Sequence, residues 1–569
     1  MFFLIGHRGV GKSSLVSKIP GGVDLDQRIS EKHDINSFFE NGNEQGFRDL
    51  EKSTLKSILN KKKTQVVALG AGFELDKFNF PEDSVFIWIQ RRSDLNGRVF
   101  FDRPKVNKNL SPLDDYFDRF ETRQKIYSKH AGLNLELLEG AENDSALKLL
   151  EKWFIGETCF SAKAYYTIKS IEDLKFYSGN IELRTDFLTE VDVLSVLNKS
   201  DKNNYILAVR TKVSKDFFEK VAKCKNLKID CPIDNKKLLE ELIEKTEFKN
   251  KVLLSSHEKI SLSDLEFAAS KNLHLKWAPQ ILSLKELRES YNLCADRDFS
   301  FLPRSEEPDG RWKWMRESLF YKNKINFYRT GLTEYMDQIS VHDLDVIKDR
   351  PQNHKGAVLG EDIFLSRSPG FHRSFFKERF SSFYSGIPLK RNEFNNENFD
   401  FIRSFGYSFF SVTAPFKDQL AFLGCEKSLN TISTGIDGLY KFTDTDRLAL
   451  EFLTEQILKY KKPLIWGSGS MGKALKELIG DKAKLISARQ YESSVLEGFD
   501  ALVWCAGPNA FTPKLAKAPY CIFDLEYKEQ SRAKQVAIEW GTSYISGEDF
   551  FVSQAKAQQS FWLETGEEK

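Results

Sequence analysis

Three groups of residues whose side chains could do chemistry follow one another along this chain of 569 residues. The first is a glycine-rich loop at residues 6–13, which reads G-x-x-x-x-G-K-S. The second is a scattered set of charged residues with a histidine between residues 182 and 276. The third combines paired serines, a lysine, an aspartate and a second glycine-rich loop between residues 366 and 472. One phosphate-binding loop, one candidate imine-forming lysine and one dinucleotide-binding pattern predict three enzymes fused end to end.

The elements expected around the first loop fit a phosphate-binding loop. Residues 2–5 are apolar, as in a buried parallel strand, and a helical stretch begins at Ser14. In such a loop the backbone N–H groups wrap a phosphate, a lysine reaches the β- and γ-phosphates, and a serine holds Mg²⁺. The alternative is a glycine-rich turn without a ligand. The pattern predicts an ATP or GTP site at Gly6, Gly9, Gly11, Lys12 and Ser13.

Further polar residues in the first part of the chain narrow the choice of phosphate acceptor. They are Asp24, Asp26, Arg48, a glycine turn at 70–72, Arg103 and Arg123. Any one of them alone could be an ordinary solvated surface residue. In this order the set resembles shikimate kinase, which implies ATP and Mg²⁺ as cofactors. The resemblance implies that Asp24 helps to hold the metal and that Asp26 binds the reacting hydroxyl. It implies that Arg48 and Arg123 bind the substrate carboxylate, and that Gly70 and Gly72 form the glycine-rich loop at the acceptor. Arg103 would be the arginine of the lid that contacts ATP. Ala71 and Asn43 stand where the family has glycines, and the methyl group of Ala71 could crowd the acceptor.

Several apolar segments in the middle of the chain end in a polar residue. They are residues 181–187, 206–210, 252–257 and 274–278, with helical stretches between them. The active site of a β/α barrel collects such strand-end residues, so this part predicts a barrel. Lys276 has apolar neighbours, where a lysine loses its charge easily and becomes a nucleophile for carbonyls, and His257 could move a proton. The ordinary alternatives are a structural histidine and a lysine that extends to solvent.

This middle set resembles type I 3-dehydroquinate dehydratase. The resemblance implies that Lys276 forms a Schiff base and that His257 is the general acid and base. It also implies a group of substrate-binding residues: Glu182, Arg184, Arg210, Arg316 and Gln338. Ser214 stands where the family has a second acid, and the span is short for a complete barrel of about 250 residues. The barrel could therefore be reduced.

The last part of the chain carries polar motifs in front of a dinucleotide-binding pattern. An apolar segment at 463–466 enters a loop with Gly467, Gly469 and Gly472, and a helical stretch follows, which is the context of a pyrophosphate site. Arg489 ends the next strand, where an NAD-specific site would carry an acid, so the sequence favours the 2′-phosphate of NADP.

The polar motifs of this part resemble those of shikimate dehydrogenase. They are S-x-S-P at Ser366, V-T-x-P-x-K at Val412, N-T at Asn430 and T-D at Thr445. The resemblance implies a proton-transferring pair, Lys417 and Asp446, and substrate contacts from Ser366, Ser368, Thr413, Asn430 and Gln554. Leu365 stands where histidine is common in the family.

The three resemblances follow the order found at the C-terminal end of the pentafunctional arom protein. We expect a kinase-like domain at 1–155, a dehydratase-like barrel at 156–345 and a two-lobed dehydrogenase-like domain at 352–569. The dehydrogenase lobes would span 352–460 and 461–545, with a C-terminal helix returning to the first. Such a chain would dehydrate 3-dehydroquinate, reduce 3-dehydroshikimate with NADPH and phosphorylate shikimate with ATP. Two alternatives are a barrel that acts on another small carbonyl, and a diverged kinase or barrel that serves as a ligand-binding or regulatory module.

Composition bounds the class of protein. Hydrophobic residues make up 41% of the chain, enough for several α/β cores. The 84 basic and 82 acidic residues are balanced, which predicts no nucleic-acid or anionic-membrane partner. Seven cysteines without a CxxC pair and the lack of an apolar run near 18 residues indicate a cytoplasmic chain without a membrane span. We expect small-molecule substrates as partners and, beyond them, a possible homodimer.

Overall fold

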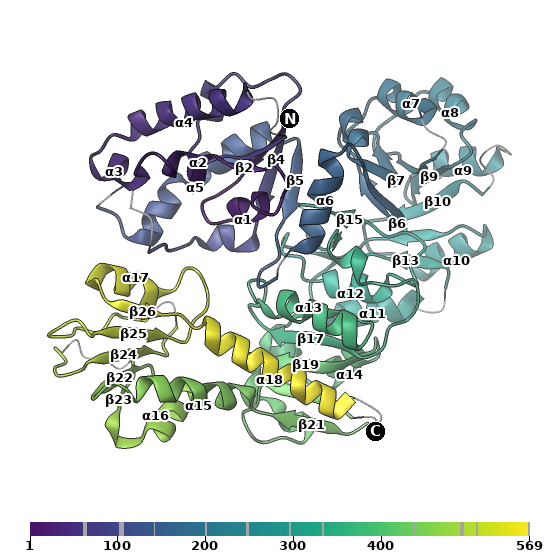
Figure 1. Ribbon diagram of the computed structural model, residues 1–569. Coiled ribbons are helices and arrows are strands. Elements are labelled where there is room, and N and C mark those ends of the chain that lie inside the picture. The colour runs from purple at the N-terminus through teal and green to yellow at the C-terminus, as the bar shows by residue number, and fades with distance from the viewer. Residues whose placement is uncertain are drawn as a thin grey trace.

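The computed structural model confirms the α/β class. It describes residues 1–60, 65–101, 107, 109–141, 143–199, 202–245, 248, 250–294, 297–332, 335–435, 438–489, 494–507 and 510–566. Four larger sheets follow one another in this part of the chain, and helices cover them (Figure 1). Within the described residues no helix is both long and apolar enough to cross a membrane.

The first sheet has five parallel strands in the order β2-β3-β1-β4-β5. Because apolar residues fill the strands, the sheet is buried, and β1 in its centre delivers the first glycine loop to the carboxyl edge. The strands are β1 (Phe2–Ile5), β2 (Val23–Asp24), β3 (Val66–Ala68), β4 (Val85–Gln90) and β5 (Leu133–Glu136). The helices are α1 (Lys12–Val16), α2 (Leu25–Ser30), α3 (Ile35–Glu40), α4 (Glu44–Leu59), α5 (Pro112–His130) and α6 (Asp144–Phe154).

The second sheet has seven parallel strands in simple sequential order. They are β6 (Cys159–Thr167), β7 (Tyr177–Arg184), β8 (Asn204–Ala208), β9 (Leu227–Pro232), β10 (Val252–Ser256), β11 (Leu275–Trp277) and β13 (Phe299–Phe301). The helices are α7 (Glu190–Lys199), α8 (Lys215–Val221), α9 (Lys236–Glu244), α10 (Leu262–Ser270), α11 (Leu284–Cys294) and α12 (Lys313–Leu319).

The segment before β15 (Tyr328–Arg329) reaches back to the first strand of this sheet. Phe327, just before β15, forms a parallel bridge with Tyr165 of β6, and the N–H of Tyr165 donates to Asn326 O at 2.7 Å. The connection after β6 holds only the 3-10 turn η3 (Ile171–Lys175). One bridge thus joins the segment before β15 to the first strand of the seven-stranded sheet.

The last two sheets divide the C-terminal part into two lobes. The first lobe has the order β18-β17-β19-β20-β21 and the second the all-parallel order β23-β22-β24-β25-β26. The strands are β17 (Lys355–Gly360), β18 (Tyr384–Pro388), β19 (Tyr407–Val412), β20 (Thr431–Thr434), β21 (Tyr440–Thr443), β22 (Pro463–Trp466), β23 (Lys484–Ile486), β24 (Ala501–Trp504), β25 (Cys521–Asp524) and β26 (Ser543–Ile545). The helices are α13 (Ser368–Arg379), α14 (Asn396–Arg403), α15 (Thr445–Ile457), α16 (Ser470–Ile479), α17 (Arg532–Trp540) and α18 (Glu548–Gly566). Figure 1 shows α18 running from the second lobe onto the first.

Polar contacts tie the parts of the chain together. Glu136 of β5 is buried and accepts from Arg329 Nη1 at 2.5 Å, which joins the first sheet to the barrel. Arg373 of α13 pairs with Asp343 at 3.1 Å, which joins the barrel to the C-terminal part. One cluster of buried apolar residues extends from Leu4 to Ile432, so the three parts pack as one body.

Candidate active sites

The backbone of the first glycine loop adopts conformations that require glycine. Gly6, Gly9 and Gly11 have φ angles of 149°, 77° and 110°, in the region that side chains disfavour. A Cβ atom at Gly6 would also come within 2.5 Å of Ile89 O. The loop leads into α1, whose first residue, Lys12, is buried and donates from Nζ to Gly6 O at 2.7 Å and His7 O at 3.1 Å. Ser13 follows on the same turn, so a helix N-terminus and a lysine meet at the loop, as phosphate binding requires.

A cavity of about 810 Å³ lies beside this loop. It brings together the predicted residues Ser13, Asp24, Asp26, Arg48, Gly70, Gly72 and Arg123. Gly70 and Gly72 face it closely, since a Cβ atom at Gly70 would lie 2.7 Å from Asp26 Oδ1 and one at Gly72 would overlap the Arg48 guanidinium. Asp24 also caps α2 by accepting from Gln27 N at 2.9 Å. Arg103 lies outside the described residues.

Two residues with no role in the sequence prediction organise this cavity. Glu51 is buried and accepts from Arg48 Nη1 at 2.7 Å, and burial, ahead of the opposing Arg48 charge, raises the pKa of Glu51 to about 7. The Tyr127 hydroxyl lies 3.1 Å from Gly6 O and 2.6 Å from Ala71 O, both within hydrogen-bond distance. It therefore links the first glycine loop to the glycine turn at residues 70–72. Glu51 lies one helical turn after Arg48 on α4, and this spacing is the signal by which sequence analysis could have found it.

A second cavity, of about 500 Å³, opens at the carboxyl ends of the barrel strands. All seven residues predicted for the barrel site line it: Glu182, Arg184, Arg210, His257, Lys276, Arg316 and Gln338. Lys276 is buried, its Nζ atom lies 3.6 Å from Glu182 Oε1, and it lies 5.1 Å from the centre of the Phe327 ring. The ammonium group therefore has acidic and aromatic neighbours.

Asp230 is the principal partner of Lys276, and the sequence analysis missed it. Lys276 Nζ donates to Asp230 Oδ2, and Arg210 Nη2 donates to the same oxygen at 3.0 Å. Asp230 is fully buried in β9, and the Lys276 and Arg210 charges lower its pKa against the opposing effect of burial. The pKa of His257 also lies below its ordinary value, because desolvation in the cavity and the positive charges of Lys276 and Arg210 disfavour protonation. A single carboxylate inside the apolar run of residues 227–232 was the available signal.

Arg316, predicted to bind the substrate carboxylate, shares this cavity with a second arginine, Arg304. Arg316 is buried on α12 and donates to the backbone carbonyls of Leu302 and Pro303, both at 3.0 Å. Arg304 also lines the cavity and donates to His257 O at 3.0 Å. Ser214 caps α8 and donates to Glu190 Oε2 at 2.8 Å, so it does not belong to the lining described for the cavity.

The C-terminal part joins Lys417 and Asp446, as the sequence predicts. Lys417 lies on the 3-10 turn η7 (Phe416–Asp418), Asp446 lies in the first turn of α15, and Lys417 Nζ donates to Asp446 Oδ2. Asn430 is buried, and its Oδ1 accepts from Thr445 N at 2.9 Å, so it holds the start of α15 in place. The remaining predicted contacts lie on separate elements: Ser366 before α13, Ser368 at its start, Thr413 after β19 and Gln554 on α18.

The second glycine loop has the form of a dinucleotide-binding turn. Gly467 has a φ angle of 117° and follows β22, and Gly469 caps α16. A Cβ atom at Gly472 would overlap Gly467 O, so only glycine allows the helix to approach the strand. Arg489 is exposed just beyond β23, the strand next to β22 in the sheet.

Comparisons with known proteins cover these parts unequally. The shikimate kinase family model matches residues 8–152. Shikimate kinase of Aquifex aeolicus is 32% identical over 143 residues, which are 22% of this chain and 81% of that protein. Shikimate kinase of Streptococcus thermophilus is 35% identical over 144 residues, 23% of this chain and 86% of that protein.

Solved structures resemble the rest of the chain more distantly. Shikimate dehydrogenase 1 from Peptoclostridium difficile has 19% identity and a TM-score of 0.29 over 38% of this chain and 94% of its own. A structure described as dehydroquinate dehydratase and shikimate dehydrogenase from S. pombe AroM has 18% identity and a TM-score of 0.26 over 73% of this chain and 97% of its own. These values are too low to assign the later parts to a family. Through its first quarter, with its phosphate-binding loop, paired aspartates and buried arginine, the chain belongs to the shikimate kinase family.

Proposed function

We propose that this chain is a trifunctional enzyme that phosphorylates shikimate with ATP, dehydrates 3-dehydroquinate and reduces 3-dehydroshikimate with NADPH. Its three domains would span 1–155, 156–345 and 352–569. The observation that carries the proposal is the buried Lys276 in a cavity with His257 and four arginines, between a kinase-family site and a Lys417–Asp446 pair. Three such sites on one chain match three reactions on closely related cyclic carboxylates.

The first cavity suits a phosphoryl transfer to a carboxylate-bearing alcohol. Lys12 and the N–H groups of the first loop would hold the phosphates of ATP, and Ser13 with Asp24 would hold Mg²⁺. ATP supplies the phosphoryl group when bound. Arg48, oriented by Glu51, and Arg123 would bind the carboxylate, and Asp26 would accept the proton of the reacting hydroxyl.

The barrel cavity suits an imine mechanism. Asp230 would hold Lys276 in place, and the amine, once deprotonated, would add to the substrate ketone; loss of water gives the imine. His257, whose lowered pKa keeps it neutral, would accept the α-proton and return a proton to the departing hydroxyl. Arg184, Arg210 and Arg304 offer cations for the substrate carboxylate, and hydrolysis of the imine restores Lys276.

The C-terminal site suits reduction of a ketone to an alcohol. The loop from Gly467 to Gly472 would hold the pyrophosphate of NADPH and Arg489 its 2′-phosphate, and NADPH supplies the reducing power when bound. Lys417 would donate a proton to the ketone oxygen, and Asp446 would hold the ammonium group in place.

Three assays on the whole chain test the proposal. ATP with shikimate, 3-dehydroquinate alone, and NADPH with 3-dehydroshikimate should each be turned over. If the barrel is inactive while the other two sites are active, the barrel is better explained as a ligand-binding or regulatory module. If the first domain is inactive, the same explanation applies to the kinase-like domain.

A further inference from the structure

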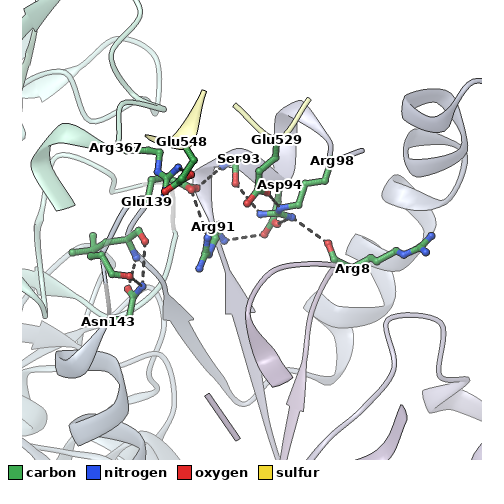
Figure 2. Close-up of polar contacts among 12 residues, drawn as sticks. Arg8, Arg91, Ser93, Asp94, Arg98, Glu139, Asn143, Arg367, Glu529 and Glu548 are labelled. Atoms are coloured by element: carbon green, nitrogen blue, oxygen red, sulfur yellow. Dashed lines mark hydrogen bonds and ion pairs between the residues drawn. The ribbon is translucent and has the colours of Figure 1, made fainter. Parts of the chain in front are cut away.

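The loop after β25 in the C-terminal part touches the kinase-family part beside its glycine loop. Figure 2 shows Glu529 pointing at Arg98, and Arg98 Nε donates to Glu529 Oε2. The backbone N–H of Val99 donates to Glu529 O at 3.0 Å. Side chain and backbone of one residue therefore hold the segment 98–99 from a position 431 residues later in the chain.

The held segment forms the wall on which the glycine loop rests. Arg98 Nη1 donates to Arg8 O at 3.3 Å, and the Arg8 guanidinium lies 4.8 Å from the centre of the Phe100 ring. A Cβ atom at Gly9 would come within 2.7 Å of the Phe100 ring and 3.0 Å of Arg98 Cδ. Because packing is this close, the backbone of residues 8–9 follows the position of residues 98–100.

The buried positive charge of Arg98 would still have an ion-pair partner if Glu529 were removed. Its side chain is 1% exposed, and it donates to Asp94 Oδ1 at 2.5 Å and Ser93 Oγ at 2.7 Å. Removal of Glu529 thus leaves the buried cation one carboxylate partner and leaves the fold intact. Other contacts also cross this interface: the centre of the Phe101 ring lies 5.3 Å from that of the Tyr544 ring and 5.7 Å from Lys534 Nζ.

We propose that Glu529 is a positioning residue for the nucleotide site of the kinase-family part. It fixes Arg98 and Val99, these fix the wall behind residues 8–9, and the loop is thereby held in the shape that takes a nucleoside triphosphate. The inference rests on the proposed function of the loop as the ATP site. It means that a dehydrogenase-like lobe completes the nucleotide site of another domain.

The test is the dissociation constant of MgATP, measured by calorimetry on the whole chain and on Glu529→Ala. We expect Glu529→Ala to weaken binding by about threefold to thirtyfold, the usual range for residues that couple sites without touching the ligand. The matched control is Glu526→Ala, a carboxylate on the same loop that pairs weakly with Lys528 and not with Arg98. Thermal unfolding should be similar for both variants.

The outcomes separate this inference from the proposed function. An unchanged MgATP affinity in Glu529→Ala, or an equal loss in Glu526→Ala, would overturn the positioning role alone. No MgATP binding by the unmodified chain would overturn the ATP site and this inference together. In a chain that carries Arg98→Lys, Glu529→Ala should add little, since both changes act through one contact.

Discussion

Lys276 and Asp230 form an ion pair at the base of the barrel cavity, and both side chains are almost fully removed from solvent, at 3% and 0% exposure. The Asp230 carboxylate, whose pKa is lowered by Lys276 and Arg210, holds the Lys276 ammonium group in position. Asp230→Asn should therefore slow dehydration of 3-dehydroquinate by about 100-fold or more, since the amine nucleophile loses the partner that orients it. Steady-state kinetics test this. Asp216→Asn, a carboxylate on α8 whose side chain is 70% exposed, is the control, and an equal loss there would contradict the role.

Borohydride should trap a covalent adduct on Lys276 during turnover of 3-dehydroquinate, because an imine is reducible. Mass spectrometry of the peptide that contains Lys276 is the measurement. Lys276→Ala should give no adduct and no dehydration. A chain that dehydrates without forming the adduct would exclude the imine route.

Lys12→Ala should lower phosphorylation of shikimate by about 100- to 1000-fold, because a charge aimed at the phosphates is lost. Reduction of 3-dehydroshikimate should be unchanged, since Lys417 and Asp446 lie in another sheet system. Lys18→Ala, an exposed lysine just after α1, is the matched control. A parallel fall in both reactions would show that the sites are not independent.

Arg489→Ala should raise the KM for NADPH by roughly tenfold and leave that for NADH nearly unchanged, because a guanidinium–phosphate contact contributes about 1.5–3 kcal/mol. The control is Lys484→Ala, exposed on the neighbouring strand β23. Lys417→Ala should instead reduce kcat with either cofactor. Equal use of NADPH and NADH by the unmodified chain would rule out the assignment of Arg489.

Acid should destabilise the chain through its buried histidines. Burial lowers the pKa of His7 and of His372 to about 3 from an ordinary value of 6.5. Between these two values the unfolded chain binds a proton on each histidine that the native chain does not, so stability falls as pH falls, by up to about 1.4 kcal/mol per histidine and pH unit. His372→Gln should flatten the dependence of the thermal midpoint on pH between 6 and 4, and His33→Gln, which is exposed, should leave it unchanged. A slope that His372→Gln leaves intact would contradict this cause.

Local sequence determined the elements that carry the sites. The two glycine loops were predictable because each needs residues without a side chain between an apolar strand and a helix, and this context is contiguous in the chain. The same holds for Lys276, Arg210 and Glu182, which lie at or near the carboxyl ends of strands whose order in the sheet is their order in the sequence. The α/β class followed from these patterns.

Tertiary packing decided the rest. Asp230 reads as one residue of an apolar strand, and only the pairing of neighbouring barrel strands brings it to Lys276, 46 residues later. Arg316 was predicted from the sequence, whereas Arg304 is brought to the same cavity by the fold, where it donates to the backbone carbonyl of His257. Glu529 meets Arg98 across 431 residues, because the docking of one domain on another obeys no sequence period. Periodicity and turn chemistry act over a few residues, whereas ion pairs between sheets depend on how whole domains pack.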